Sequence, residues 1–420
     1  MLRKLLYFVR SLFLNFSNSS KERSFNPSLR TLCLGMFFII PFFTFGQTVV
    51  PFTTNGTYSF IPPAGITSVT VECWGAGGAG GMANQTFANG GGGGGGGYSR
   101  SAVTVASGTS YAIVVGKGGT PSTTTTTRAG GNSTFGTTTV VARGGTGGTG
   151  AQPGANGVGG ATGTGTFTRA GGDGADGVNE DYGGGGGSSA GTAATGVTAT
   201  NYNGATAPTG GGNGGKGFEG TSTVGGDGLP GVVPGGGGGG GRSPENTAAR
   251  TGGLGADGQV KLTFTCPSYS IASTSVSPAT VCVGGTTTVT VTGVSTTLPV
   301  GNYTVTYDAG ASTGLTKAMT VSTAGVLTSG SFTTASLGTA GSIVIKITNL
   351  TSGTGGTCSS NITNLNSATV TVSPLPSAAT AVSGPATVCQ GQSGVAYTVT
   401  AIANAAGYTW TLPSGATIAS

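Results

Sequence analysis

The sequence predicts an all-β protein, and three observations support that prediction. Glycine contributes 87 of the 420 residues, about three times its usual share. Charged residues make up only 7% of the chain, against about 25% in ordinary globular domains. Outside the glycine tracts, short stretches alternate apolar and polar residues, which is the period of a strand with one buried face. We therefore expect a glycine-rich β domain of polyglycine II type, followed by immunoglobulin-like β-sandwich modules.

A leader precedes the β-rich part of the chain. Residues 32–45 form an uncharged apolar run that follows several basic residues, and Thr44 and Gly46 place small residues just before Gln47. This pattern predicts a cleaved signal peptide over residues 1–46, and therefore a secreted, extracellular or cell-surface protein. An uncleaved membrane anchor is the alternative. It would need about 20 apolar residues, so we expect no membrane span in the mature chain.

The formal net charge of +6 comes almost entirely from this leader. Residues 1–46 hold six Lys or Arg and one acid, so the remainder of the chain is close to neutral. Nucleic-acid binding needs clustered Lys and Arg to neutralise phosphates. The sequence therefore predicts no nucleic-acid partner.

The first predicted domain covers residues 47–266. Alternating stretches predict strands at its edges, namely residues 57–61, 68–74, 98–105, 110–115, 137–142 and 258–265. Most glycines lie between these edge strands, with tracts at residues 90–97, 183–187, 210–215 and 235–241.

The glycine tracts admit two interpretations. A flexible linker is the simpler one, because glycine loses more backbone freedom on ordering than any other residue. Polyglycine II helices are the other: these are extended, have about three residues per turn and hold no internal hydrogen bonds, so neighbouring helices must pair with one another. The strand-like residues 112–115 between the tracts, and the closing strand that ends at Thr265, favour an ordered lattice.

Residues 61–81 contain a strand that ends in Trp-Gly-Ala-Gly-Gly and leads into the glycine body. Residues 90–98, 131–136 and 252–262 then fit further elements of a known pattern, and they occur in its order. The pattern is that of bacterial secreted surface proteins with a glycine-rich domain. The first domain resembles that family. Similar bodies occur in phage tail-tip adhesins and in a receptor kinase ectodomain, so the resemblance implies a recognition role.

The second predicted domain covers residues 267–376. Short alternating strands, separated by Gly, Asn, Asp and Pro, predict an immunoglobulin-like β-sandwich. The region resembles the repeated modules of large bacterial surface proteins. Cys282 precedes the first strand and Cys358 follows an isoleucine-rich one. We predict a disulfide between Cys282 and Cys358, because an exported chain favours disulfides.

The third region covers residues 383–420. Its stretches at residues 384–397 and 408–418 resemble a PKD-like sandwich domain. It holds less than half of the about 100 residues of a sandwich, so we expect a truncated module in an N-terminal fragment. Cys389 would then pair with a residue beyond Ser420.

Catalysis is not expected. The sequence contains no histidine, so it offers no Ser-His-Asp or Cys-His pair and no imidazole acid or base. Lys117 and Lys216 are each followed by glycine, so no phosphate-binding GxxxxGK[ST] loop is present. We predict a protein that is not an enzyme and needs no cofactor.

Residues 171–179 match the nonapeptide that binds Ca²⁺ in parallel β-helices. Asp173 and Asp176 are the calcium candidates, because Ca²⁺ prefers carboxylate and carbonyl oxygens. Such sites share ligands between tandem turns, and the one other partial copy is distant, at residues 252–260. Ordinary turns in glycine-rich sequence are the simpler interpretation, so no metal is expected.

The predicted function is adhesion or surface recognition, with a cell-surface glycan or protein as the partner. Loops on a rigid scaffold commonly carry recognition, and aromatic residues are favoured anchors. The candidate ligand-binding residues are Phe87, Tyr98, Phe167, Tyr182, Tyr202 and Phe218. Each could instead pack against the edge strands. A structural stalk, matrix or surface-layer component is the alternative function, and ice binding is a remote third.

Overall fold

The computed structural model describes residues 46–418, apart from residues 123–127, 151–152, 180, 222 and 245–248. The predicted signal peptide therefore lies outside the described residues, except for Gly46. Among the residues that are described, no helix is long and apolar enough to cross a membrane. The chain is almost entirely strand and extended segment, which confirms the all-β prediction.

Two antiparallel sheets form the base of the glycine-rich domain. The first contains β1 (Gln47–Phe52), β3 (Ser68–Trp74), β4 (Tyr98–Thr104), β8 (Phe167–Arg169) and β9 (Gln259–Thr265), in the order β1-β9-β3-β4-β8. The second contains β2 (Gly56–Phe60), β5 (Tyr111–Val115), β6 (Ser133–Phe135) and β7 (Val140–Ala142), in the order β2-β5-β6-β7. Their inward side chains share one core, which includes the fully buried Val71, Ile113 and Leu262.

Most edge strands lie where the alternation predicted them. One predicted strand, residues 137–142, is shorter in the structure, because Thr137 has a φ of 53° and belongs to the turn between β6 and β7. β6 and β8 were not predicted from the sequence, and neither was β1. It pairs along its whole length with β9, from Gln47 opposite Thr265 to Phe52 opposite Val260.

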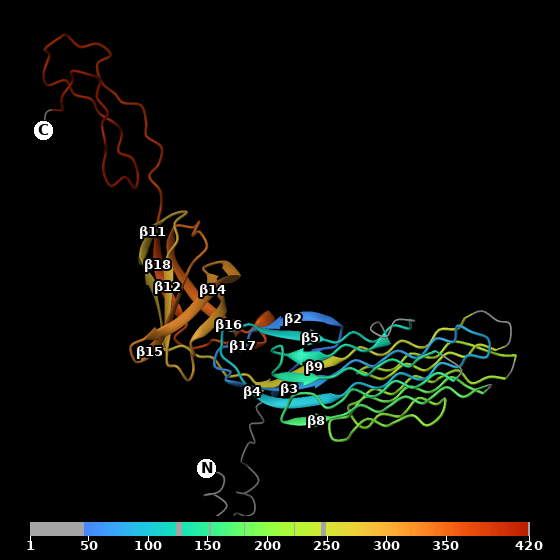
Figure 1. Ribbon diagram of the computed structural model, residues 1–420. Helices are drawn as coiled ribbons and strands as arrows, with labels where there is room; N and C mark the ends of the chain where they lie inside the picture. The colour runs from blue at the N-terminus through green and yellow to red at the C-terminus, as the bar shows by residue number, and fades with distance from the viewer. Residues whose placement is uncertain are drawn as a thin grey trace, which may run out of the picture. The chain divides into compact units, whose positions relative to one another are not determined.

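The glycine segments form an ordered lattice, which we call the glycine bundle: the extended segments between residues 75 and 258 (Figure 1). The N–H groups of Gly75, Gly78 and Gly81 donate to the carbonyls of Gly97, Gly94 and Gly91 at 2.8–2.9 Å. Every third residue thus bonds to the same antiparallel neighbour.

The two residues between Gly75 and Gly78 bond to other segments of the bundle. Ala76 N donates to Gly131 O, and Gly77 N donates to Ala256 O. Three successive residues therefore bond to three separate segments, which is what a helix with about three residues per turn requires. The tracts are polyglycine II segments in a hydrogen-bonded lattice, and the linker interpretation is wrong.

Close backbone approach explains why the lattice needs glycine. A Cβ atom added at Gly93 would lie 2.2 Å from the carbonyl oxygen of Gly78, and one at Gly78 would lie 2.0 Å from the carbonyl oxygen of Thr146. Both neighbours are backbone atoms, which cannot rotate away as a side chain can. A side chain at either position would push two segments apart.

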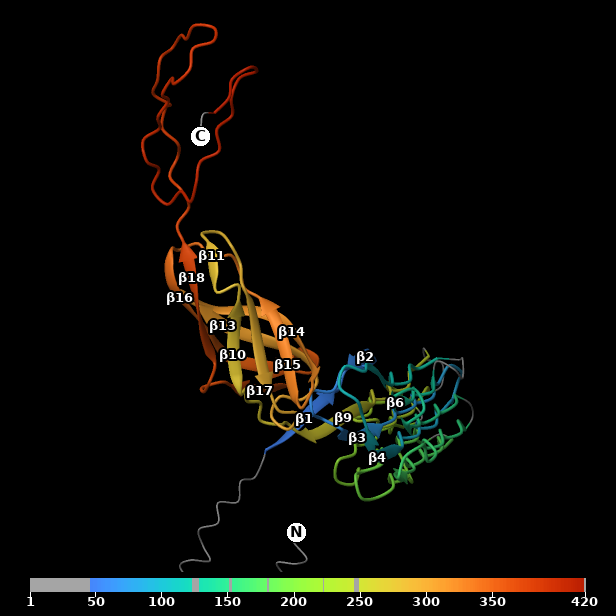
Figure 2. The same ribbon diagram turned by 90° about the vertical axis from the view of Figure 1, so that its left-hand side faces the viewer.

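The following domain is one nine-stranded sheet (Figure 2). Its strands are β10 (Ser273–Ser277), β11 (Thr280–Cys282), β12 (Thr288–Gly293), β13 (Gly301–Ala309), β14 (Ser312–Ala324), β15 (Leu327–Thr333), β16 (Gly341–Ser352), β17 (Cys358–Asn361) and β18 (Ser367–Ser373), with a 3₁₀ turn η1 (Thr354–Gly356). The order is β10-β12-β15-β14-β13-β16-β18-β11, and β17 pairs with β16. β10 also lies against β18, so the sheet folds back around a core that includes Tyr307, Ile345 and Ile347. The immunoglobulin-like topology stays a prediction.

The disulfide joins Cys266 to Cys358, so the predicted pairing of Cys282 with Cys358 is wrong. Cys358 pairs with Ser352 at one end of β16, whereas Cys282 lies beside Ser373, next to the opposite end of that strand. The 12 residues of β16 separate the two positions by roughly 35–40 Å at the usual rise per residue. Cys266 directly follows β9, and the Tyr269 N–H donates to the Ser360 hydroxyl at 2.8 Å, which holds this segment against β17.

The third region has little regular structure. From residue 374 to residue 418, the structure contains no strand, only one isolated bridge between Ser383 and Thr398. Most side chains there are exposed, including those of Tyr408 and Ile418.

We expect Gly93→Ala to lower the free energy of unfolding by about 2 kcal/mol or more. The added methyl group would overlap backbone atoms, which cannot rotate away as a side chain can. Gly338→Ala is the matched control, since a Cβ atom there would meet nothing within 4 Å, and it should change stability by less than about 0.5 kcal/mol. Chemical denaturation of both variants measures the difference. Equal stability of the two variants would contradict the lattice.

Removing the disulfide by Cys266→Ala with Cys358→Ala should lower stability by about 4 kcal/mol, because the bond closes a loop with a sequence separation of 92. Cys282→Ala should leave stability unchanged, since Cys282 is exposed and unpaired. Denaturant titration of both variants tests the pairing. A large loss on replacing Cys282 would restore the pairing predicted from the sequence.

Candidate functional site

Tyr98 is a core residue and not a loop anchor, so that prediction is wrong. It lies on β4, fully buried, and its ring centroid is 4.9 Å from that of Trp74. Its hydroxyl donates to Glu72 Oε1 at 2.7 Å, and Glu72 also pairs with Lys261 at 2.6 Å. Burial, with the hydrogen bond to Glu72, raises the pKa of Tyr98. Trp74 and Tyr98 also pack with Ala190 of the glycine bundle, so this group lies where the first sheet meets the bundle.

Phe167 also lies on a strand, β8, and not in a loop between glycine segments. Its ring centroid is 6.2 Å from that of Tyr98. The Arg169 guanidinium lies 4.0 Å from the ring, and that of Arg100 lies 5.1 Å from it. Phe167 therefore packs at the strand end of the domain, where both arginines cover it.

Three other predicted aromatics lie on neighbouring segments away from the strands, and two of them, Tyr182 and Tyr202, are in ring contact. Tyr182 lies in the turn after residues 170–177, and its ring centroid is 5.4 Å from that of Tyr202. Gly183 N donates to the carbonyl of Phe218, and Gly217 N donates to the carbonyl of Tyr202, at 2.9 and 2.8 Å. The lattice hydrogen bonds thus hold these separate turns side by side.

Two charged residues complete the group. Lys216 Nζ lies 4.8 Å from the Tyr202 ring centroid and 3.8 Å from Glu219 Oε2. We call Tyr182, Tyr202, Lys216, Phe218 and Glu219 the aromatic cluster. Its three rings are half-buried and both charged side chains are exposed.

Glu219 also acts on Tyr202. A hydrogen bond to Glu219, with the negative charge of that carboxylate, raises the pKa of Tyr202. Tyr202 therefore stays a neutral phenol at physiological pH. The cluster offers aromatic faces, two phenols, one cation and one anion within a short distance.

Arg242 fixes the loop next to the cluster, and sequence reasoning missed it. Its side chain is 1% exposed. Its Nη1 donates to the carbonyls of Thr221 and Val224. The sequence did contain a signal for this role, because Arg242 is the charged residue that directly follows the last glycine tract. A buried guanidinium needs fixed acceptors, so it orders the turn after Glu219.

Phe87 occupies a turn with a φ of 57°. The Asn89 side-chain amide donates to its carbonyl at 3.0 Å, and Asn89 forms a bridge with Arg242. Within the described part of the chain, no ring contact joins Phe87 to the aromatic cluster. It therefore belongs to a neighbouring loop.

Asp173 and Asp176 act as hydrogen-bond acceptors at the surface of the bundle. Asp173 Oδ1 accepts from Gly159 N at 2.7 Å, and Asp176 Oδ1 accepts from Asn156 N at 2.8 Å. Residues three apart lie on the same side of a polyglycine II segment, which explains the spacing of the motif without a metal. Among the described residues, no group of three or more acidic or cysteine side chains could hold a metal ion.

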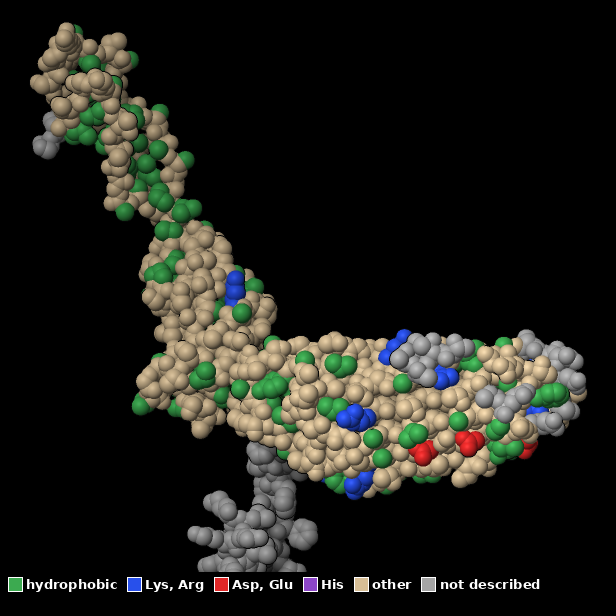
Figure 3. All heavy atoms as spheres, in the orientation of Figure 1, with side chains coloured by type: hydrophobic (Ala, Val, Ile, Leu, Met, Phe, Trp, Pro, Cys, Tyr) green, Lys and Arg blue, Asp and Glu red, His purple; other side chains and the backbone are tan. Residues whose placement is uncertain are grey.

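Charged side chains are sparse on the surface. In the face drawn in Figure 3, Lys, Arg, Asp and Glu are scattered and form no large single-sign patch.

Comparison with known families gives two matches. A family described as a glycine-rich domain matches residues 53–265, about half of the chain. A PKD-like domain matches residues 375–420. No curated protein matches the sequence. The PKD-like domain, together with the disulfide, suggests an extracellular, surface-type protein.

Asp173→Ala should lower the free energy of unfolding by about 1 kcal/mol and speed hydrogen exchange at Gly159 N–H, because this donor loses its acceptor. Asp173→Asn should keep most of the stability, since the amide oxygen can still accept. Denaturation with amide exchange by NMR measures both effects. Unchanged exchange at Gly159 in the alanine variant would refute this role.

Proposed function

Because the chain belongs to the glycine-rich domain family, we propose that it is a secreted adhesin-type surface protein of bacterial origin. It binds a cell-surface glycan or protein through the aromatic cluster and its neighbouring loops. The glycine bundle serves as the scaffold, and the sheet domain and PKD-like region connect it to the rest of the surface.

The ring contact between Tyr182 and Tyr202, which come from separate turns, carries this proposal. Phe218 lies on a neighbouring segment, where its carbonyl accepts from Gly183 N. The three residues are distant in sequence, and hydrogen bonds of the lattice hold their backbones together. Binding loses less free energy when the contacting side chains are already ordered. Rigid aromatic side chains are also the commonest anchors of recognition surfaces.

The distribution of shifted pKa values supports a non-catalytic role. Burial raises the pKa of Tyr269 to about 12 and also raises those of Cys73 and Tyr303, yet all three lie in the core of the two domains. Functional acids and bases are shifted within accessible clefts. Tyr202, which is half-buried, also has a raised pKa, so it stays protonated at neutral pH and offers a hydroxyl for hydrogen bonding.

A structural role is the second candidate. The disulfide ties the end of β9 to β17, and the Tyr269 hydroxyl donates to the Ala64 carbonyl at 3.0 Å. These contacts join the glycine-rich domain firmly to the sheet domain, as a stalk or matrix component requires.

The chain should bind to an array of cell-surface glycans and matrix proteins, and Tyr182→Ala with Tyr202→Ala should weaken that binding at least about tenfold. Tyr408→Ala is the matched control, because Tyr408 is 47% exposed in another region. Equal binding by wild type and double variant would exclude the aromatic cluster as the site. Self-assembly without binding would favour the structural role.

A further inference from the structure

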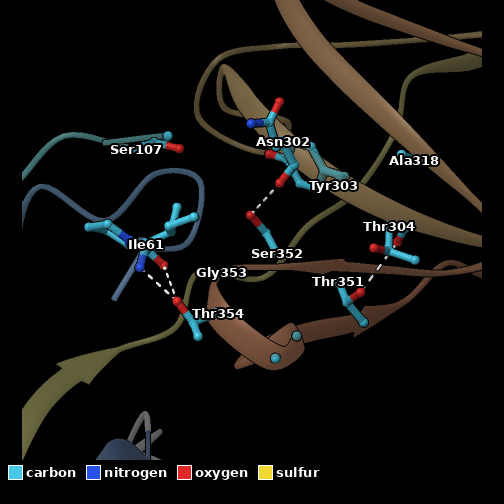
Figure 4. Close-up of a pocket in the computed structure, with 14 residues that line it drawn as sticks. Ile61, Ser107, Asn302, Tyr303, Thr304, Ala318, Thr351, Ser352, Gly353 and Thr354 are labelled. Atoms are coloured by element: carbon cyan, nitrogen blue, oxygen red, sulfur yellow. Dashed lines mark hydrogen bonds between the residues drawn. The ribbon is translucent and has the colours of Figure 1, made fainter. Parts of the chain in front are cut away.

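A separate pocket lies where the two domains meet (Figure 4). Ile61, Pro62, Ser107 and Gly108 of the glycine-rich domain form one side. Residues of β13, β14, β16 and η1 form the other. The cavity has a volume of about 540 Å³, within the range of small-molecule sites.

The lining is neutral throughout. It contains no Lys, Arg, Asp or Glu, and its polar side chains are hydroxyls and one amide. A charged ligand would lose hydration there without gaining a partner of opposite charge. The pocket therefore selects against ions of either sign.

Some of the polar groups already have partners that hold the walls together. Ser352 Oγ accepts from Ala64 N at 2.9 Å and donates to Asn302 O at 2.7 Å. Thr354 Oγ1 accepts from Ile61 N at 2.6 Å. The bonds from Ala64 N and Ile61 N cross between the domains, and the bond to Asn302 O joins β16 to β13. The pocket is therefore formed before any ligand arrives.

Other polar side chains of the pocket lining remain available for hydrogen bonds to a ligand. Asn302 Oδ1 accepts from the Thr320 hydroxyl at 2.9 Å, which fixes the orientation of the amide. In the described structure, Asn302 Nδ2 and the hydroxyls of Ser107 and Thr304 donate no hydrogen bond to protein. One fixed donor and two hydroxyls that can donate or accept thus surround the cavity.

The apolar part of the lining complements these groups. Ile61 is 39% exposed, and Pro62 and Ala318 also line the cavity. A ligand that combines several hydroxyls with an apolar C–H face would match both kinds of contact. In Figure 4, Ile61 and Ser107 lie on one side of the pocket and Thr304 and Thr351 on the other.

We propose that this pocket binds one neutral sugar residue, as a second binding site independent of the aromatic cluster. The hydroxyls of the sugar bond to Asn302 Nδ2, Ser107 and Thr304, and its C–H face contacts Ile61. Acidic and amino sugars are excluded by the neutral lining.

Titration of the chain with neutral hexoses and N-acetylhexosamines, followed by NMR chemical shifts, tests the proposal. Saturable millimolar binding is expected, with glucuronic acid, N-acetylneuraminic acid and glucosamine at least about tenfold weaker. Ser107→Trp fills the cavity and should abolish binding, whereas the exposed Ser295→Trp should not. No binding by any neutral sugar, or equal binding of the charged ones, would overturn the proposal.

Asn302→Asp provides a second variant that does not depend on filling space. It keeps an oxygen for the Thr320 hydroxyl but replaces the Nδ2 donor with a carboxylate oxygen, so binding should fall at least about tenfold. Tyr182→Ala with Tyr202→Ala should leave this binding unchanged. Loss of sugar binding in that double variant, with Asn302→Asp unaffected, would assign the sugar to the aromatic cluster instead.

Discussion

Every backbone N–H in the glycine bundle must find an acceptor, most often a carbonyl on another segment, and the rest of the domain follows from that constraint. Ordering one residue costs roughly 1–2 kcal/mol, and glycine loses the most freedom. A hydrogen bond returns only about 1 kcal/mol net. A single glycine segment is therefore unstable, whereas a segment between three neighbours also gains Cα–H···O contacts. The lattice forms as a whole, with the two sheets holding the ends of its segments.

The surface of such a lattice poses the same difficulty as the edge of a β-sheet, because outward N–H groups lack a neighbour. The chain solves it with short polar side chains. Asp173 and Asp176 accept from one outer segment, residues 154–160, while the hydroxyls of Thr146 and Thr149 accept from the same segment at 2.7 and 2.8 Å. Pro230, exposed on another outer segment, has no N–H to satisfy. The few polar residues among the glycines therefore complete the lattice.

The sequence was most informative where one segment alone decides the structure. Alternation located most of the edge strands, and the strands between the tracts indicated order. Tyr98 was misassigned because it directly follows a glycine tract, although it is also the first residue of an alternating strand. Its inward position depends on the pairing of β4 with β3, which brings Tyr98 opposite Trp74.

Other features depend on which segments become neighbours, and no single stretch encodes that. The roles of Asp173 and Asp176 require knowing that residues 154–160 lie beside them. The disulfide requires knowing which end of β16 each cysteine occupies. The aromatic cluster arises from turns whose proximity is set by the lattice. The sequence therefore supplied its three aromatic members, but neither Lys216 and Glu219 nor their grouping.

The three-neighbour pattern also restricts how such a chain can change in length during evolution. Adding one residue inside a segment rotates every later N–H by about 120° toward the wrong neighbour, because the segment makes one turn in about three residues. Insertions of three residues keep the pattern and extend the segment by one turn. The rule of three applies only inside the extended segments, so turns such as those at Tyr182 and Tyr202 can change length by any number of residues. Relatives of this protein should therefore differ freely in their turns and in steps of three within their glycine segments.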